Sequence, residues 1–250
     1  THGVSEASKA LSDVDVVSEE VTRIGYSIIK NVFSKKDCAL AKKKIDNIYR
    51  RQIKECGDEK FLYSINDQDV ARALFLYDDF FLKFINNKSI NKCLKRVFGN
   101  KYILNLQNAP INRPHNSHYG STWHRDLSYQ HFVPSRPISI TTVVCLNKFT
   151  KKNGGTCILP FSHKFEKFTS NKFVKKNEHF VEAEEGDVLF FDSLLFHRAG
   201  ANNTAKERKL IVQLFTLPFI KQQIDYSKVL NGKYSKNKEF SYILGYDTSV

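Results

Sequence analysis

The fold of this chain is decided by residues 186–219, which read GDVLFFDSLLFHRAGANNTAKERKLIVQLFTLPF. Three apolar runs, GDVLFF, SLLFHRAG and RKLIVQLFTLPF, lie within this stretch and are separated by polar residues. Short apolar runs rich in β-branched and aromatic residues, bounded by Gly, Asn and Asp, predict strands joined by turns. The stretch therefore predicts part of an antiparallel β-sheet protein.

The polar stretch AGANNTAKE predicts a turn between two of these strands. If a hairpin turned symmetrically about Asn202 and Asn203, His197 and Arg208 would be cross-strand neighbours on one face. Their Cβ atoms would then lie about 5 Å apart. We therefore expect an imidazole and a guanidinium side by side inside the fold.

The same strand pattern extends back to residue 102. Further runs are YILNLQNAP (102–110), RPISITTVVCL (136–146), GGTCILPF (154–161) and HFVEAEE (179–185). Many short strands that follow a helical block predict a mainly β protein with flanking helices. We expect a double-stranded β-helix core, that is, a cupin-like jelly roll.

The block before residue 102 is predicted to be mostly helical. Residues 24–33 predict a strand, and residues 34–52 an amphipathic helix capped by Ser34. Two further helices are expected over 68–77 and 80–97, with the second ending at Gly99. The buried stripe of the helix 34–52 would consist of four residues at helical spacing, Cys38, Ala41, Ile45 and Ile48.

The length of 250 residues and the lack of a Gly/Ser/Pro-rich seam favour one domain. We expect that domain to span residues 18–220. Residues 1–17 predict a loose N-terminal segment, and residues 221–250 a C-terminal extension packed on the same domain as a wrap or lid.

Composition narrows the functional classes. The net charge is +13, but the basic residues are mostly Lys and spread along the chain, which disfavours a nucleic-acid partner and favours a solvated basic surface or anionic small molecules. No apolar run is long enough to insert in a membrane, and no signal peptide is evident. Five scattered cysteines fit a reducing compartment, so we expect a cytoplasmic protein.

The residues that carry chemistry begin with Trp123-His124-Arg125-Asp126. On an extended strand, residues i and i+2 point to the same face, so His124 and Asp126 can converge on one metal ion. His197, which follows an apolar strand, is the best third ligand. Two imidazoles and one carboxylate, with positions left open for a co-substrate and O2, are typical of non-haem Fe(II) oxygenases.

Arg208 suggests the identity of the co-substrate. A buried guanidinium needs an anion, and its planar fork matches a carboxylate. A dicarboxylate that chelates the metal at one end and reaches Arg208 at the other describes 2-oxoglutarate. Two alternatives stay open: Arg208 could be an exposed member of the charge run 206–209, and His197 could be a hydrogen-bonded core histidine.

Several segments together resemble the phytanoyl-CoA dioxygenase-like branch of the Fe(II)/2-oxoglutarate-dependent oxygenases, from about residue 24 to residue 219. They are GYSIIKNVF (25–33) before a helix, the WHRD motif (123–126), NGGT (153–156) leading to LPFSH (159–163), EGDVLFFD (185–192) leading to His197, and Arg208 eleven residues further on. Phe161 stands where the family usually has glycine.

The resemblance implies that His124, Asp126 and His197 hold Fe(II) and that Arg208 binds the far carboxylate of 2-oxoglutarate. Family members often carry a hydroxyl two residues after the second histidine, where this chain has Ala199. Asn105 and Gln107 share one strand face in a region that the family uses near the co-substrate, although they could equally form a surface face.

Other histidines carry weaker expectations. His163 is interpreted as structural, closing a turn. His115 and His118 lie in the stretch 110–122, which predicts a mobile loop over the barrel mouth, and they are interpreted as surface residues.

The resemblance implies an oxygenase that consumes 2-oxoglutarate and O2 and releases succinate and CO2. Retention of Asp126 favours hydroxylation over halogenation. We expect an aliphatic C–H bond of a small or carrier-linked metabolite, which can be anionic, to be attacked. The alternatives are a metal-binding cupin-like barrel that does not use 2-oxoglutarate, and a non-enzymatic module whose basic surface binds nucleic acid or an acidic carrier.

Overall fold

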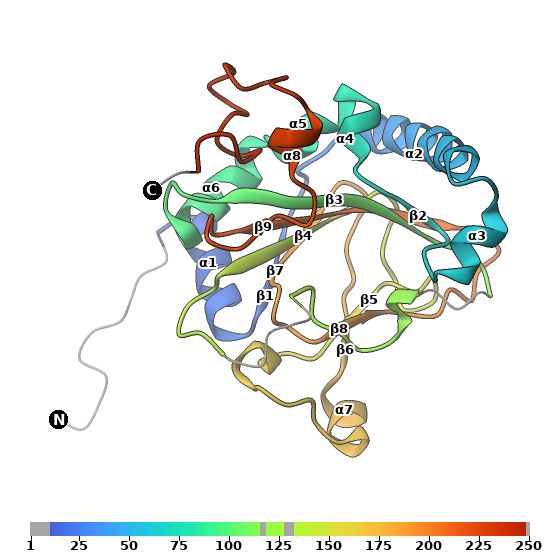
Figure 1. The fold of residues 1–250 in the computed structure, drawn as a ribbon. Coiled ribbons are helices and arrows are strands. Elements are labelled where there is room, and N and C mark those ends of the chain that lie inside the picture. Colours follow the sequence, from blue (N-terminus) through green and yellow to red (C-terminus); the bar gives the residue numbers. More distant parts are fainter. Residues whose placement is uncertain (1–10, 116–118, 128–132, 249–250) are drawn as a thin grey trace.

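A computed structural model describes residues 11–115, 119–127 and 133–248. Two β-sheets face each other, and helices cover the outer face of the larger sheet (Figure 1). The larger sheet has the strand order β1-β7-β4-β9-β3-β2, and the smaller has the order β6-β5-β8. All strand pairs are antiparallel. The predicted double-sheet core with helices on one side is confirmed.

The strands of the larger sheet are β1 (Tyr26–Ile29), β2 (Val70–Ala71), β3 (Ile103–Asn112), β4 (Ser139–Cys145), β7 (Val188–Asp192) and β9 (Arg208–Thr216). Those of the smaller sheet are β5 (Thr156–Ile158), β6 (His179–Phe180) and β8 (His197–Ala199). The eight α-helices of the described part are α1 (Asp13–Arg23), α2 (Lys35–Glu55), α3 (Glu59–Ser64), α4 (Leu74–Tyr77), α5 (Leu82–Ile85), α6 (Lys88–Phe98), α7 (Asn171–Asn177) and α8 (Tyr226–Val229). Short 3₁₀ turns are η1 (Asp79–Phe81), η2 (Tyr119–Ser121) and η3 (Ser162–Lys164).

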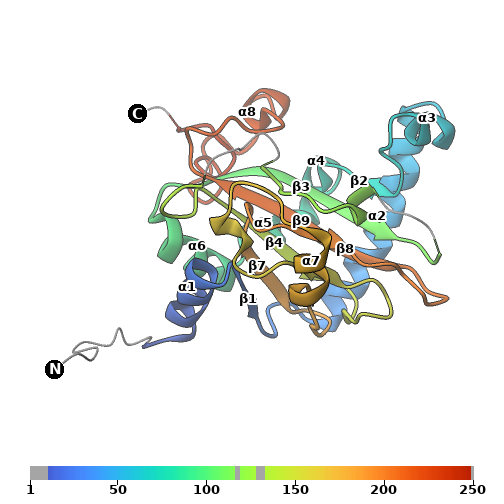
Figure 2. The same cartoon turned by 90° about the horizontal axis from the view of Figure 1, so that it is seen from below.

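The helix α2 forms as its sequence predicts. The Ser34 hydroxyl accepts a hydrogen bond from the backbone N–H of Asp37 at 3.1 Å and caps the first turn. All four residues of the predicted stripe, Cys38, Ala41, Ile45 and Ile48, are buried in the core against the larger sheet. Figure 2, which views the molecule from below, shows α2 and α3 at one end of that sheet and α1 and α6 at the other.

The prediction of two continuous helices over 68–77 and 80–97 is wrong. The chain there forms β2, α4, η1, α5 and α6 instead of two continuous helices. Asp69 and Ala73 adopt left-handed backbone conformations, with φ of 60° and 48°. Asp78 and Asn87 accept hydrogen bonds from backbone N–H groups and start new helical turns. These caps break the helices, although the predicted end at Gly99 is confirmed.

The N-terminal boundary also differs from the prediction. Residues 1–10 lie outside the described part, but α1 already begins at Asp13, within the segment expected to be loose. The Ser12 side chain caps α1 by accepting from the Asp15 N–H, and Val17 and Val21 of α1 enter the main core.

The C-terminal segment packs on the helical layer. Tyr226 and Leu244 are buried in the same core cluster as the helices and the larger sheet. The ring of Tyr226 lies 4.9 Å from that of Phe75 on α4. We keep the predicted division of the chain near residue 221 as a prediction.

The two faces of the larger sheet have different neighbours because side chains alternate along each strand. On β9, Ile211 and Phe215 pack in the main core under the helices, whereas Leu210 and Val212 face the smaller sheet. Arg208 belongs to the second set, so its side chain enters the space between the sheets. This alternation positions the site described next. No helix of the described residues is long and apolar enough to cross a membrane.

Candidate active site

A pocket with about 600 Å³ of empty space, part of it open to solvent, lies between the two sheets. Its wall is formed by β3, β4 and β9 of the larger sheet, by β5 and β8 of the smaller one, and by the arm that precedes residue 127. The lining residues are Pro110, Asn112, Gly120, His124, Asp126, Val143, Thr156, His197, Arg198, Ala199, Arg208, Leu210 and Val212. Four of the residues singled out in the sequence thus meet in one place.

The segment carrying His124 and Asp126 is not the strand that the sequence predicted. It forms a single β-bridge, in which the backbones of His124 and His197 exchange two hydrogen bonds of 3.0 Å. The Asp126 N–H donates to the carbonyl oxygen of Ser193 at 3.0 Å. This pairing with β8 fixes the arm, so both side chains still point into the pocket.

The three side chains form a compact His-Asp-His cluster. The Nε2 atoms of His124 and His197 lie 3.8 and 3.5 Å from Oδ1 of Asp126. One potential ligand atom from each residue lies within 4.8 Å of the other two. Such a donor set suits a divalent first-row metal.

Backbone carbonyls orient both imidazoles. The Nδ1 of His124 donates to the Thr122 carbonyl oxygen at 2.8 Å, and the Nδ1 of His197 donates to the Leu195 carbonyl oxygen at 3.0 Å. A proton held on Nδ1 leaves the lone pair on Nε2, which is the atom turned toward Asp126. In its neutral form each ring therefore has the tautomer that a metal ligand requires.

The charges of the cluster follow from burial and mutual contact. Burial raises the pKa of Asp126, but the neighbouring His197 and His124 outweigh it and hold that pKa at about 2. Burial lowers the pKa of His197, yet contact with Asp126 raises it above the usual value overall. The carboxylate is thus ionised and ready to bind a cation at neutral pH.

A chain of hydroxyl groups lies behind Asp126. The Thr141 hydroxyl donates to Oδ2 of Asp126 and lies 2.9 Å from the Ser193 hydroxyl, which accepts from Ser139 at 2.8 Å. All three hydroxyl residues are buried. The chain occupies the second carboxylate oxygen and leaves Oδ1 facing the histidines.

Arg208 reaches the pocket by a route other than the predicted hairpin, and this prediction is wrong. His197 on β8 is opposite Ile158 of β5, whereas Arg208 on β9 is opposite Asn112 of β3. The two residues therefore belong to different sheets and approach the same pocket from opposite walls. The chain between them crosses from one sheet to the other, which local symmetry of the turn could not reveal.

The guanidinium of Arg208 is buried and only partly paired. The residue is 2% exposed; its Nη2 donates to the Gly154 carbonyl oxygen at 2.7 Å, and its Nε donates to that of Asn153 at 3.2 Å. The guanidinium carbon lies 4.5 Å from the centre of the Phe149 ring. Nη1 has no hydrogen-bond partner among the described residues. Burial lowers the pKa of Arg208 to about 10, so the group stays charged at neutral pH.

The turn that receives Arg208 requires glycine. Gly154 has φ +74°, and a Cβ atom there would lie 2.3 Å from the carbonyl oxygen of Gly200 and 2.6 Å from Nδ2 of Asn112. A side chain at this position would push the turn away from the guanidinium. The NGG segment identified in the sequence is thus the floor of the Arg208 site.

Comparison with known proteins identifies the family. The family model described as phytanoyl-CoA dioxygenase (PhyH) matches residues 21–210. The chain belongs to the phytanoyl-CoA dioxygenase family. Family membership and the His-Asp-His cluster make it an Fe(II)- and 2-oxoglutarate-dependent oxygenase that uses O2.

Individual relatives are similar over most of this chain. The chain is 26% identical to an uncharacterized protein of Mycobacterium tuberculosis over 88% of this chain and 81% of that one. It is 24% identical to the peroxisomal phytanoyl-CoA dioxygenase of Homo sapiens over 75% of this chain and 63% of that one. It is also 24% identical to the dioxygenase andF of Emericella variicolor, over 78% and 72%.

Solved structures show the same fold. The non-heme monooxygenase ThoJ, in a complex with Ni, superposes with a TM-score of 0.63 at 15% identity, over 83% of this chain and 80% of that one. The non-heme alpha-ketoglutarate-dependent epimerase SnoN from nogalamycin biosynthesis gives a TM-score of 0.63 at 16% identity, over 82% and 83%. The predicted jelly-roll architecture is that of these oxygenases.

Within this family fold, Asn105 and Gln107 lie away from the pocket, contrary to the expectation from sequence. Gln107 is buried under the helices, where its amide donates to Gln213 and to the Phe81 carbonyl oxygen, both at 3.0 Å. Asn105 sits at a register shift in β3 and bonds to the backbone of Lys221. The residues of β3 that line the pocket occupy the opposite face.

Thr156, the last residue of the NGGT segment, is a pocket residue to which the sequence analysis assigned no role. It is buried on β5 directly opposite Ala199 of β8, the position where the family often carries a hydroxyl. Its own hydroxyl forms no hydrogen bond within the described part of the chain. The strand register that brings Thr156 beside Ala199 has no signal in the sequence, because the two positions are far apart along it.

His163 and His115, two further histidines considered in the sequence, lie outside the cluster. His163 is buried, with Nε2 3.2 Å from the Thr22 carbonyl oxygen, which fits its predicted structural role. The His115 N–H donates to the Asn202 carbonyl oxygen. His118 lies outside the described residues. Part of the predicted mobile loop is not loop, because β3 continues to Asn112.

Proposed function

We propose that this oxygenase hydroxylates an aliphatic C–H bond, with Fe(II) held by His124, Asp126 and His197 and the far carboxylate of 2-oxoglutarate held by Arg208. One observation carries the proposal. The buried guanidinium of Arg208 lies in the same pocket as the His-Asp-His cluster and has an unpartnered Nη1. A buried cation without a carboxylate partner is costly unless a ligand supplies one.

The residues present fit the metal. Two neutral imidazoles with free Nε2 lone pairs and one ionised carboxylate are the donors that Fe(II) uses in such enzymes. The carbonyls of Thr122 and Leu195 and the hydroxyl of Thr141 hold the three side chains in place. Outer contacts of this kind support metal affinity.

The residues also fit the co-substrate. Arg208 offers Nη1 to a carboxylate, while Nη2 and Nε stay anchored to the NGG turn. Thr156 adds a free hydroxyl on the opposite wall, where it can replace the hydroxyl missing at Ala199. We propose Thr156 as the second group that binds the carboxylate.

When bound, iron with 2-oxoglutarate and O2 supplies the oxidising power, and succinate and CO2 are the expected products. The chain positions the reactants. Arg208 and the cluster fix the co-substrate from two walls, and the apolar side chains of Val143, Leu210 and Val212 exclude water between them. The carboxylate of Asp126 occupies the position that halogenation would need open, which favours hydroxylation.

As the substrate we propose a small or carrier-linked metabolite, with anionic ones favoured. The net charge of +13 supports attraction of an anionic substrate. We also propose a cytoplasmic location. The five cysteines are all unpaired, which fits a reducing compartment.

The test is an anaerobic titration of the Fe(II)-loaded protein with 2-oxoglutarate, followed by the visible charge-transfer band of the chelate. Wild type should develop the band, and Arg208→Ala should need at least about 100-fold more 2-oxoglutarate, since a charged hydrogen-bond pair is lost in a buried site. Arg51→Ala, an exposed arginine of α2, serves as the matched control and should titrate like wild type.

A wild-type protein that binds iron but gives no band would contradict the proposal. That outcome would favour the second candidate, a metal-binding barrel that does not use 2-oxoglutarate. Equal titration of wild type and Arg208→Ala would leave iron in place but remove Arg208 from the co-substrate site.

A further inference from the structure

A protruding segment on the far side of the smaller sheet combines exposed aromatic rings with unpaired lysines. Residues 161–177, which we call the basic aromatic surface, comprise η3, a loop and α7 (Figure 1). The rings of Phe165, Phe168 and Phe173 are 47, 42 and 44% exposed. Large apolar side chains gathered in one exposed segment mark an interaction site more often than single ones do.

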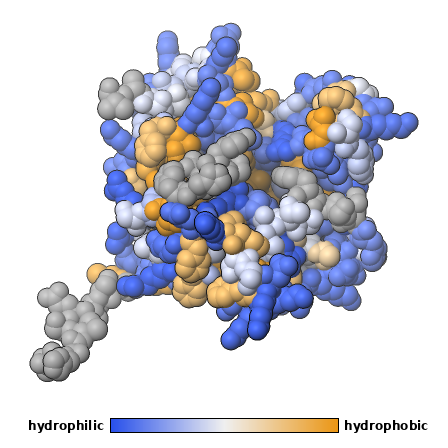
Figure 3. Space-filling model, turned by 60° about the horizontal axis from the view of Figure 1, so that its bottom comes forward, coloured by the Kyte–Doolittle hydropathy of each residue, from blue (hydrophilic) through white to orange (hydrophobic). Residues whose placement is uncertain are grey.

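The charge of this surface is strongly positive. Five lysines, including Lys172, Lys175 and Lys176 of α7, stand against one acidic residue, Glu166. All five lysines are exposed, and none forms an ion pair within the described residues. Figure 3, in which the underside of the molecule is turned forward, shows hydrophobic patches among projecting hydrophilic side chains.

The surface is firmly attached to the body of the protein. Arg125 donates to the Ser162 carbonyl oxygen at 3.0 Å and stacks on the Phe196 ring at 4.1 Å. The Phe168 ring lies 5.9 Å from that of Trp123 and 4.9 Å from that of Phe196. Since Trp123 and Arg125 flank His124, and Phe196 precedes His197, the surface is tied to the backbone that carries two residues of the cluster.

We propose that residues 161–177 dock the protein peripherally on a membrane surface rich in anionic lipid. Phenylalanine rings enter the boundary between headgroups and acyl chains, while lysines stay at the headgroup level and attract anionic lipids. A protruding segment with rings and charges side by side fits a broad, deformable surface of this kind. Docking would hold the oxygenase at the bilayer without any inserted helix.

Charge complementarity distinguishes this occupant from an apolar one. Each lysine near an anionic membrane contributes about a fivefold factor in affinity at moderate ionic strength. The phenylalanines add affinity by burying apolar surface in the bilayer, which a soluble polyanion does not offer. The proposal therefore requires both kinds of side chain, and each can be tested separately.

The first experiment measures co-sedimentation of the metal-free full chain with vesicles of phosphatidylcholine alone or with about one third phosphatidylserine, a content at which the surface is clearly anionic. Wild type should bind the phosphatidylserine vesicles and lose this binding as the salt concentration is raised. It should bind hardly at all to vesicles of phosphatidylcholine alone. K172E/K175E/K176E should weaken binding by at least about 100-fold. The matched control K35E/K36E/K43E makes the same charge change on exposed positions of α2 and should change binding by less than about threefold, because α2 lies on the other side of the molecule.

A second pair of variants tests the rings. F165S/F173S should weaken binding by about tenfold or more through lost apolar burial. F219S, which changes a phenylalanine that is 76% exposed elsewhere, should bind like wild type. Phe168 is left unchanged because it stacks beside the site. Thermal unfolding of each variant checks that the fold is kept.

Three outcomes would overturn the proposal. The first is that wild type does not bind anionic vesicles. The second is that the α7 and α2 charge variants lose vesicle binding equally. The third is that the α7 charge variant loses binding to a single-stranded RNA probe while its vesicle binding is unchanged. The last would assign the surface to nucleic acid instead. The docking assay uses neither iron nor 2-oxoglutarate, so its failure leaves the proposed hydroxylase function untouched.

Discussion

Arg208 and Lys209 are neighbours on β9, both buried, but they serve different faces of the sheet. Lys209 is 4% exposed and points to the helical side, where its Nζ lies 2.5 Å from both Asp46 and Glu207. Arg208 points between the sheets and has no carboxylate partner among the described residues. Two buried cations side by side therefore show which face is complete and which needs a ligand.

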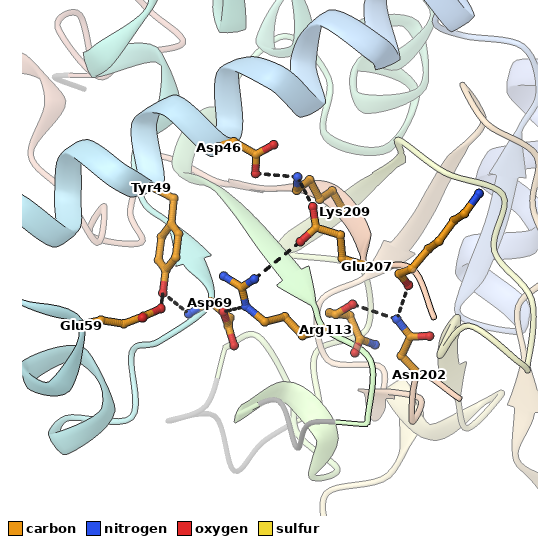
Figure 4. Close-up of polar contacts among 10 residues, drawn as sticks. Asp46, Tyr49, Glu59, Asp69, Arg113, Asn202, Glu207 and Lys209 are labelled. Atoms are coloured by element: carbon orange, nitrogen blue, oxygen red, sulfur yellow. Dashed lines mark hydrogen bonds and ion pairs between the residues drawn. The ribbon is translucent and has the colours of Figure 1, made fainter. Parts of the chain in front are cut away.

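The helical face carries a continued polar network. Figure 4 shows Lys209 bonded to Asp46 of α2 and to Glu207, whose carboxylate lies 3.7 Å from Arg113. Arg113 also pairs with Asp69. This network fixes the start of β9 against α2, so that alternation turns Arg208 inward. The fully paired Lys209 on the helical side thus helps to position the partly paired Arg208 on the pocket side.

The largest effect is expected when a residue of the His-Asp-His cluster is removed from the pocket face. His197→Ala should lower Fe(II) affinity by more than about 100-fold, because even contacts outside the ligand set contribute 10–100-fold. Formation of succinate from 2-oxoglutarate should fall below about 1% of wild type in the same assay. The buried His163, changed to Ala, is the control and should keep its metal affinity even if it loses stability. Retained iron binding in His197→Ala would show that the cluster is not the metal site.

Exchange of the two neighbouring cations for methionine sharpens the contrast directly. Arg208→Met should leave the unfolding free energy of the ligand-free protein within about 1 kcal/mol or raise it, since an unpaired buried charge is replaced by an apolar chain. The thermal stabilisation by 2-oxoglutarate should disappear. Lys209→Met should lower the unfolding free energy by about 1 kcal/mol, because two partly solvated carboxylates lose their cationic partner. This variant should keep the stabilisation by 2-oxoglutarate. Denaturant unfolding with and without 2-oxoglutarate measures both.

The amide pair beneath the helices gives a third test. Gln107→Leu removes the partner of Gln213 and of the Phe81 carbonyl, and should cost about 1–3 kcal/mol of unfolding free energy. The affinity for 2-oxoglutarate should change less than twofold, since the side chain faces away from the pocket. A tenfold loss of affinity without a stability change would restore Gln107 to the co-substrate site.

The smallest effect concerns pH. Asp187 is buried; burial raises its pKa, but backbone N–H groups and Lys30 outweigh this and lower it below the usual value of 3.8. A lowered pKa in the folded state adds stability above the pKa of the unfolded state, and this stability is lost as pH falls through the folded pKa. Asp187→Asn should therefore flatten the fall in unfolding free energy below about pH 4 relative to wild type. The same fall in unfolding free energy with pH in both proteins would contradict this.

Much of the site could be predicted from local sequence. His124 and Asp126, two residues apart, both line the pocket as their spacing predicted, although the arm forms a single bridge and not a strand. The stripe of α2 is buried as its spacing requires. The helices predicted over 68–97 failed because single capping residues, such as Asp78 and Asn87, break a pattern that apolar spacing alone makes continuous.

The sequence by itself determined the residue types of the site, the β-rich class and the family, since these depend on short-range spacing and on motifs. Only the tertiary structure decided that His197 and Arg208 face each other from different sheets, that Thr156 lies beside Ala199, and that Gln107 faces the helices. These relations depend on strand register and on crossovers between sheets. Both are set by packing among segments distant in the chain, which leaves no local pattern in the sequence.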